Sequence, residues 1–204
     1  LQQTANNTLG FSARATMSSA QKLYQEGKIT YMRTDSVHLS GQAINGIQSY
    51  INNNFGEKYS QVRQFKTKSA NAQEAHEAIR PTDISASVAS SNPYDQKLYT
   101  LIRNRTLASQ MASAVTEKTT VTINGDNLPN NNYFEAKGEV IVFDGFLKVY
   151  GSKQDDTILP PISSGMALRF SEAIAKQVFS RPPARFTEGS LVKKLEELGI
   201  GRPS

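Results

Sequence analysis

The stretch SARATMSSAQKLYQEGKITYMRTDS, residues Ser12–Ser36, decides the fold of the first half of the chain. Ser12 is a residue type that caps helices, and the apolar residues after it recur at a spacing of three or four, which places them on one helical face. Gly27 stands where a glycine often ends a helix. We therefore predict a helix between Ser12 and Gly27, followed by a short extended segment at Lys28–Arg33.

The chain from residue 37 to 115 also has a helical pattern. Ser40 and Gly56 bracket an apolar stripe, which predicts one helix. Asn71 and Glu74 form a capping-box pattern, which predicts a second, short helix that ends before a proline. Asn92 precedes a third helix, with Pro93 in its first turn. The predicted inward residues are Ile44, Ile47, Ile51 and Phe55 in the first of these helices, and Leu98, Leu101, Ile102, Ala108 and Met111 in the last. The capping-box helix is expected to run through Ala78 or Ile79.

From about Glu117 the sequence becomes rich in β-branched residues, which predicts antiparallel strands. The predicted strand segments are Thr119–Ile123, Gly138–Phe143, Gly145–Tyr150 and Met166–Phe170. After Pro182-Pro183, Thr187 caps a last amphipathic helix, with Leu191, Val192, Leu195 and Leu198 inward and Gly199 as its stop. The fold class is therefore α+β: a mainly helical part, an antiparallel β segment and the start of another helical part.

Composition limits the classes of protein and site. The chain has 204 residues, a net charge of +5 and no cysteine, which excludes disulfides, thiolate metal sites and cysteine nucleophiles. No apolar run is long enough for a membrane span, so we expect a cytoplasmic protein without a membrane partner. Residues 1–115 carry 12 basic and 7 acidic side chains, whereas residues 116–204 carry 11 of each. An anionic partner would therefore meet the first half, although this excess also fits a role in solubility alone.

Tyr31 and Arg33 form the most informative pair. In an extended segment they lie on the same side, so a phenol would stand beside a guanidinium whose planar fork matches phosphate. The phenol needs its proton removed or its developing charge stabilised before it attacks a phosphodiester, and Arg33 can supply the second. The competing interpretation is a half-buried strand edge with no chemistry.

Two further groups carry cations. His76 and Arg80 lie four residues apart, so on a helix they would share a face and could bind one phosphate together. Two last-turn cations that interact with the helix dipole explain the same pattern. Near the end, Gly199 and Gly201 flank a loop in which Arg202 is exposed and the backbone could approach a phosphate chain.

The segment ITYMRTDS, Ile29–Ser36, resembles the active-site tyrosine segment of bacterial DNA topoisomerase I, of the type IA family. Other blocks occur in the same order: LQQTANNTLGFSARATMSSAQKLY before it, AQEAHEAIRPTD after it, and RPPARFTEGSLVKKLEELGIGRPS at the end. The likeness spans nearly the whole chain and is weakest between about residues 119 and 179. This likeness favours a nucleophile over a half-buried strand edge as the interpretation of Tyr31.

The resemblance implies a role for each site residue. Tyr31 attacks one DNA strand and becomes joined to the 5′ phosphate, and Arg33 contacts the scissile phosphate. His76, with Arg80 as its companion, lies near a bound DNA phosphate. Arg202, in the GRPS segment, contacts DNA from another domain.

The resemblance also implies an organisation and a set of partners. Residues 1–115 correspond to the helical tyrosine domain, 116–181 to part of a β arch and 182–204 to the start of a helical base. The substrate is a single-stranded segment of negatively supercoiled DNA, no ATP is used, and the protein is a monomer. Mg²⁺ belongs to an acidic Toprim domain that has no counterpart in this sequence, so the chain is expected to bind no cofactor.

Two observations frame the alternatives. The chain begins at Leu1 without an initiator methionine and ends one turn after a helix, so we expect a piece of a longer protein. Because the Toprim domain that the resemblance implies is missing, we expect this piece to be inactive alone. A non-catalytic module that binds single-stranded nucleic acid, with Tyr31 stacked on a base, is the main rival. A purely structural domain is the third hypothesis, and it predicts no salt-dependent DNA binding.

Overall fold

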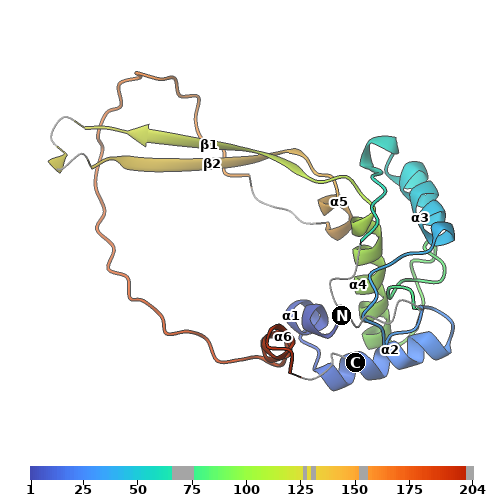
Figure 1. The fold of residues 1–204 in the computed structure, drawn as a ribbon. Helices are drawn as coiled ribbons and strands as arrows, with labels where there is room; N and C mark the ends of the chain where they lie inside the picture. Colours follow the sequence, from blue (N-terminus) through green and yellow to red (C-terminus); the bar gives the residue numbers. More distant parts are fainter. Residues whose placement is uncertain (66–75, 126–127, 130–131, 152–155, 201–204) are drawn as a thin grey trace. The chain divides into compact units, whose positions relative to one another are not determined.

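The computed structural model describes residues 1–65, 76–125, 128–129, 132–151 and 156–200. The chain divides into two compact units (Figure 1). The first unit contains Leu1–Ser113, Gly145–Gly151 and Arg185–Ser204, and the second contains Ala114–Asp144 and Ser152–Ala184. The α+β class is confirmed, whereas the three-part division at residues 115 and 181 stays a prediction.

The first unit is helical. Its elements are α1 Gln2–Leu9, α2 Ala13–Gln25, α3 Gly41–Asn54, the 3₁₀ turn η1 Glu57–Tyr59, α4 Pro93–Ser109, α5 Leu147–Tyr150 and α6 Glu188–Glu197. Ser12, Ser40, Asn92 and Thr187 each accept a hydrogen bond from a backbone N–H in the first turn of the helix that follows. These caps confirm the predicted starts of α2, α3, α4 and α6. Gly27, with φ 68°, ends the α2 segment as predicted.

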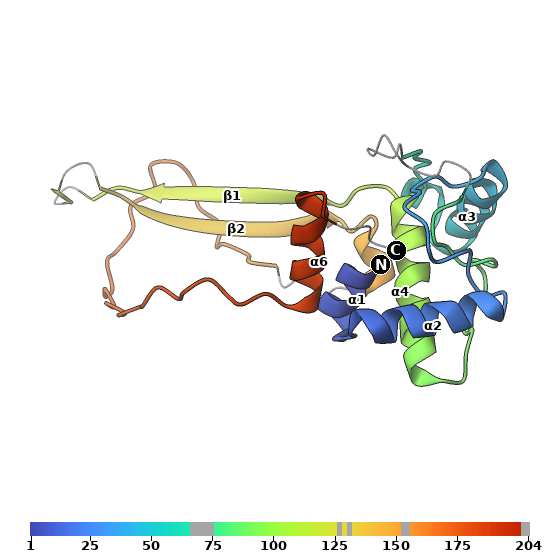
Figure 2. The ribbon, with the colours of Figure 1, turned by 60° about the horizontal axis from the view of Figure 1, so that its bottom comes forward.

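The core of this unit forms where α1, α2 and α4 pack together (Figure 2). Leu23 of α2 and Leu98 of α4 are fully buried, and Tyr99 is 1% exposed. The Lys22 ammonium, also on α2, lies 2.8 Å from the carboxylate of Asp95, which is 4% exposed at the start of α4. A buried carboxylate needs such a partner, so the ion pair fixes how the two helices meet.

Helix α6 packs against α1 in the same unit, as both ribbon views show (Figures 1 and 2). The Gly189 N–H donates to Asn6 Oδ1 at 3.0 Å, and Glu188 Oε2 accepts from the Ala13 N–H at 2.7 Å. A Cβ at position 189 would lie 2.8 Å from Asn6 Oδ1, so glycine permits this close approach. The contact joins segments that lie more than 170 residues apart in sequence.

The second unit contains a two-stranded antiparallel sheet of β1 Val115–Ile123 and β2 Phe134–Phe143, in the register Thr119↔Gly138. Glu139 also pairs with Thr157 through two backbone hydrogen bonds of 3.0 Å. The Thr157 carbonyl would lie 2.8 Å from a Cβ at Gly138, so glycine permits the close approach of the segment around Thr157 to β2. The two predicted strands around residues 120 and 140 are therefore confirmed.

Several expectations about secondary structure are wrong. The segment Gly145–Tyr150 is not a strand: Gly145 turns the chain with φ 48°, the Phe146 N–H donates to Ala112 O at 2.9 Å, and a short helix follows. Residues 166–170 form no strand. In α6, Leu191 and Leu198 are 45% and 58% exposed, so they do not point inward. A helical hydrophobic stripe shows which face is apolar and not what covers it.

The prediction of a capping-box helix is also wrong for the part of that segment that the structure describes. Residues 76–80 are bends and irregular backbone. The reason is tertiary: the Ala78 N–H donates to His38 O and the Arg80 N–H donates to the Thr30 hydroxyl, so these groups bond to another segment rather than within a helix. Asn71 and Glu74 lie outside the described residues. Separately, no helix in the described part of the chain is long and apolar enough to cross a membrane.

Candidate active site

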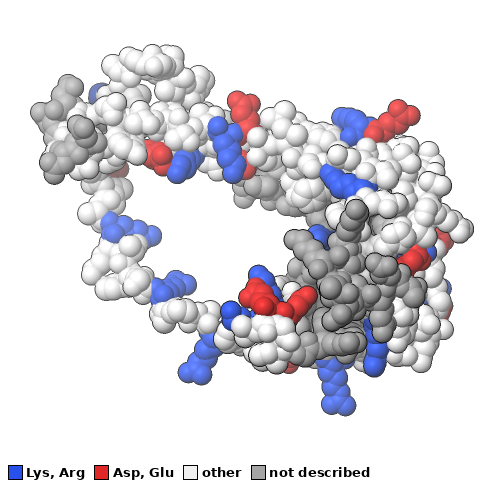
Figure 3. Space-filling model, in the orientation of Figure 1, with Lys and Arg blue, Asp and Glu red and all other residues white. Residues whose placement is uncertain are grey.

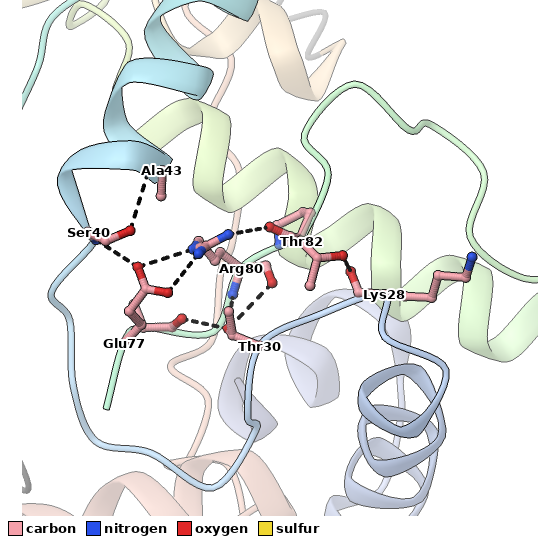
Figure 4. Close-up of polar contacts among 9 residues, drawn as sticks. Lys28, Thr30, Ser40, Ala43, Glu77, Arg80 and Thr82 are labelled. Carbon is pink, nitrogen blue, oxygen red and sulfur yellow. Dashed lines mark hydrogen bonds and ion pairs between the residues drawn. The ribbon is translucent and has the colours of Figure 1, made fainter. Parts of the chain in front are cut away.

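Residues 78–82 hold the start of the tyrosine segment through hydrogen bonds. Ile29 and Pro81 form an antiparallel bridge, flanked by hydrogen bonds from the Thr30 N–H to Arg80 O and from the Thr82 N–H to Lys28 O. The Thr30 hydroxyl donates to Ala78 O at 2.7 Å and accepts from the Arg80 N–H at 2.9 Å (Figure 4). The backbone on the N-terminal side of Tyr31 is therefore fixed by residues 78–82.

An ion pair braces this supporting segment. The Arg80 guanidinium lies 2.6 Å from the Glu77 carboxylate and also donates to Pro81 O at 3.0 Å (Figure 4). The same carboxylate accepts from the Ser40 N–H at 2.7 Å, at the start of α3. Burial alone would raise the pKa of Glu77, but hydrogen bonds from Arg80 and Ser40 outweigh it and lower the pKa to about 2. Arg80 is thus occupied within the protein.

The Tyr31 ring lies between two other rings. Tyr24, on α2, contacts it edge-on with the ring centroids 5.3 Å apart, and His76 lies 5.6 Å away at an interplanar angle of 34°. Tyr31 is half-buried, and its hydroxyl forms no hydrogen bond with any described residue. The ring is therefore restrained while the phenolic oxygen stays available for chemistry.

Arg33 is exposed, and none of the residues the structure describes pairs with its guanidinium. The expected common face of Tyr31 and Arg33 does not come from a regular strand, because the backbone bends at Thr30, Met32 and Arg33. Met32 between them is 4% exposed and joins the core. Burial of Met32 anchors the segment and leaves its two neighbours nearer the surface.

The structure brings together Tyr31 and His76, which the sequence placed 45 residues apart. The Nδ1 atom of His76 is buried without a hydrogen-bond partner. Arg80 does not join His76 on a helical face, because the helix is absent there and its guanidinium pairs with Glu77. Arg202 lies outside the described residues, so its role stays a prediction.

Sequence reasoning missed two residues of the site. No role in the site was predicted for Tyr24 from the sequence, yet it is 40% exposed and contacts the Tyr31 ring. Thr30, next to the tyrosine, supplies the hydroxyl that joins the two segments. The signal for Tyr24 was its residue type, because a tyrosine ring packs against other rings while its hydroxyl needs a polar partner or water. Thr30 gave no signal that sequence spacing could reveal.

Charge and metal ligands complete the description of the site. On the face displayed in Figure 3, Lys and Arg side chains are scattered and do not gather over one element. Within the described ranges, no group of three or more His, Cys, Asp or Glu residues is placed to hold a metal ion.

A family model described as DNA topoisomerase matches residues 1–204. The chain belongs to this DNA topoisomerase family. It is 44% identical to DNA topoisomerase 1 of Campylobacter jejuni and to that of Salmonella typhimurium, with all of this chain aligned in both cases. The fold is similar to full-length topoisomerase I from Thermotoga maritima, with a TM-score of 0.78, 34% identity and 99% of this chain covered.

The family relationship applies to a part of those relatives. The chain spans 31% of the Campylobacter protein, 24% of the Salmonella protein and 34% of the Thermotoga chain. The predicted membership of the topoisomerase I family is confirmed over the full length of this chain. The roles of the individual site residues are not tested by these similarities.

Proposed function

We propose that this chain supplies the nucleophile with which a type IA DNA topoisomerase breaks and rejoins one DNA strand. The observation that carries the proposal is the state of Tyr31: its backbone is fixed by residues 78–82, its ring is restrained by Tyr24 and His76, and its hydroxyl has no partner among the described residues. A side chain held in this way is prepared for attack.

The reaction is an exchange of one phosphodiester for another. The phenolic oxygen of Tyr31 forms a bond to the phosphorus, and the bond from phosphorus to the 3′ oxygen breaks. The 5′ phosphate stays on the tyrosine, and the phenolic proton is transferred, through groups outside this chain, to the departing 3′ oxygen. Because the two esters are of the same kind, resealing is the same step reversed and needs no ATP.

Arg33 and His76 are assigned to the phosphate. The exposed guanidinium of Arg33, which pairs with no described residue, can bind a non-bridging oxygen and stabilise the charge that grows during attack. The His76 imidazole lies beside the tyrosine ring, at a distance that suits contact with the same strand. Arg80 acts in this proposal as the brace of the supporting segment, and Arg202 as a DNA contact from the end of the chain.

The whole protein completes the proposal. It relaxes negatively supercoiled DNA in the bacterial cytoplasm as a monomer, with Mg²⁺ held by an acidic Toprim domain outside this chain. The fragment alone is inactive, because the groups that move the proton are absent from it. These statements rest on family membership and on the length of the relatives.

The experiment uses the full-length protein that contains this chain. It is incubated with single strands labelled either at the 5′ end or on the 3′ side of the break, and then denatured. We expect only the second label to remain on the protein, and we expect Tyr31→Phe to abolish this adduct. Tyr94→Phe, which removes a hydroxyl from a 64%-exposed tyrosine on α4, is the matched control and should leave it unchanged.

Two results would oppose the proposal. An adduct that survives Tyr31→Phe would show that another residue is the nucleophile. Salt-dependent binding of single strands without any adduct in the unmodified protein would favour the rival function, a non-catalytic nucleic-acid module.

A further inference from the structure

A cavity of about 380 Å³ lies next to the tyrosine segment in the first unit. Thr34, Asp35 and Ser36 form one wall, and Leu101, Ile102 and Arg105 of α4 form another. The volume is at the small end of the range for ligand sites, which suits one nucleotide and excludes a duplex. The Glu77–Arg80 brace is not part of its wall.

Arg105 contributes a cationic side chain to the wall of this cavity. Its side chain is exposed, and no hydrogen bond or ion pair engages the guanidinium in the part of the chain that the structure describes. By contrast, Arg103 on the same helix donates to Tyr50 Oη and Ile84 O, and Arg63 donates to Ser109 O and Met111 O. Arg105 therefore has its full set of donors available for a phosphate.

The wall opposite Arg105 adds hydroxyl donors. Thr34 Oγ1 accepts from the Ser36 N–H at 3.0 Å, and Ser36 Oγ accepts from the His38 N–H at 3.2 Å. These bonds use oxygen lone pairs and fix both side chains, while each hydroxyl hydrogen stays free to donate. The apolar floor of Leu101 and Ile102 suits the face of a sugar or base, and the Asp35 carboxylate suits an N–H donor on a base edge.

The cavity is close to the nucleophile along the chain. Thr34 follows Tyr31 by three residues, so their Cα atoms are at most about 11 Å apart. Each nucleotide of a stacked strand advances by about 3.4 Å along the helix axis, so this distance corresponds to about one to three nucleotides.

We infer that this cavity binds a nucleotide on the 3′ side of the break, with its phosphate on Arg105. The inference rests on the proposed function, in which the 5′ phosphate stays joined to Tyr31. The nucleotides that remain with this unit while the strand is broken are then those on the 3′ side of the link. A second anchor on the same unit keeps this end oriented for resealing, because the covalent bond alone leaves the strand free to rotate.

The first test measures binding of a fluorescent oligothymidine to the full-length protein over a series of salt concentrations. For Arg105→Gln we expect weaker binding and a slope of log K against log salt that is smaller by about 0.7, as for one lost phosphate contact on a single strand. Lys97→Gln is the matched control, because it removes the same charge from an exposed position of α4 outside the cavity. Arg105→Lys should keep the slope and lose part of the affinity, since it keeps charge without the planar fork.

The second test locates the phosphate. Adduct formation is measured with oligonucleotides that carry one neutral methylphosphonate linkage at successive positions on either side of the break. In the unmodified protein, the linkage at one of the first three positions on the 3′ side should reduce adduct several-fold. The same linkage should have no further effect in Arg105→Gln, because the contact is already lost.

The inference is overturned if Arg105→Gln and Lys97→Gln lower the salt slope equally, or if no methylphosphonate position distinguishes the unmodified protein from Arg105→Gln. These outcomes are separate from failure of the proposed function. If an adduct survives Tyr31→Phe, the nucleophile assignment fails, and the salt series still reports whether Arg105 binds phosphate. Circular dichroism checks the fold of each variant. We expect it to be unchanged, because the Arg105 side chain is exposed and pairs with no described residue.

Discussion

Glu77 is the residue that connects the structural brace to the site. Its carboxylate accepts from the Ser40 N–H and pairs with Arg80, whose backbone N–H in turn donates to the Thr30 hydroxyl next to Tyr31. The chain of contacts therefore runs from the start of α3 to Thr30, the residue before Tyr31. Glu77 thus supports the segment that holds Thr30.

The lowered pKa of Glu77 predicts a pH dependence. A carboxyl whose pKa is about 2 in the folded state, against an ordinary value of 4.5, contributes stability that is complete above about pH 4.5 and is lost as the pH falls toward 2. We expect Glu77→Gln to reduce the free energy of unfolding by about 1–2 kcal/mol at neutral pH. Urea unfolding of the chain at several pH values, followed by helical circular dichroism, measures this effect.

Glu57→Gln provides the control for this prediction, because Glu57 is exposed at η1 and no described side chain bonds to it. The difference between the unmodified chain and Glu77→Gln should shrink as the pH falls from 4.5 toward 2. A constant difference over this range would show that the ion pair does not set the pKa.

Among the elements, α4 organises the first unit, because it carries Leu98 and Tyr99 of the core and the buried Asp95. Its first turn is defined by Asn92, whose Oδ1 accepts from the N–H groups of Tyr94 and Asp95 at 2.9 and 3.3 Å. Pro93 at the first helical position lacks an N–H and leaves none unsatisfied. The cap therefore also positions the carboxylate that pairs with Lys22.

We expect Asn92→Ala to destabilise the chain by about 1 kcal/mol, because two helix N–H groups lose their acceptor. Asn92→Asp is the matched variant, since it keeps an acceptor and places a negative charge at the positive end of the helix dipole. It should unfold at the same urea concentration as the unmodified chain or at a higher one. Equal destabilisation by both changes would assign the loss to something other than the cap.

At the scale of the whole molecule, the first unit is discontinuous in sequence: its first 113 residues, α5 and the last segment pack together. The closing contact is the one between α1 and α6, which depends on the absence of a side chain at Gly189. A single methyl group at this position tests how firmly the last helix is held.

We expect Gly189→Ala to weaken the docking of α6 by about 1–3 kcal/mol, because the new Cβ overlaps Asn6 and displaces a hydrogen bond. Alanine favours the helix itself by up to about 1 kcal/mol, so helix content should not fall. Hydrogen exchange measures the effect as faster exchange of α6 amides. Lys193→Ala, at an exposed position of α6, should leave exchange unchanged, and unchanged exchange in Gly189→Ala would show that Asn6 adapts without cost.

Residue types alone determined the helix starts at Ser12, Ser40, Asn92 and Thr187, because a cap is a local interaction between a side chain and the next turn. The segment around Tyr31 was also recognisable from sequence, since its residue types and order are specific. Tertiary structure alone decided the backbone of residues 76–80, the helix at Leu147–Tyr150 and the pairing of Arg80 with Glu77. In the first two cases, a backbone polar group bonds to a segment distant in the sequence, which no local pattern can encode. Glu77 lies only three residues from Arg80, but its carboxylate is also held by the distant Ser40 N–H.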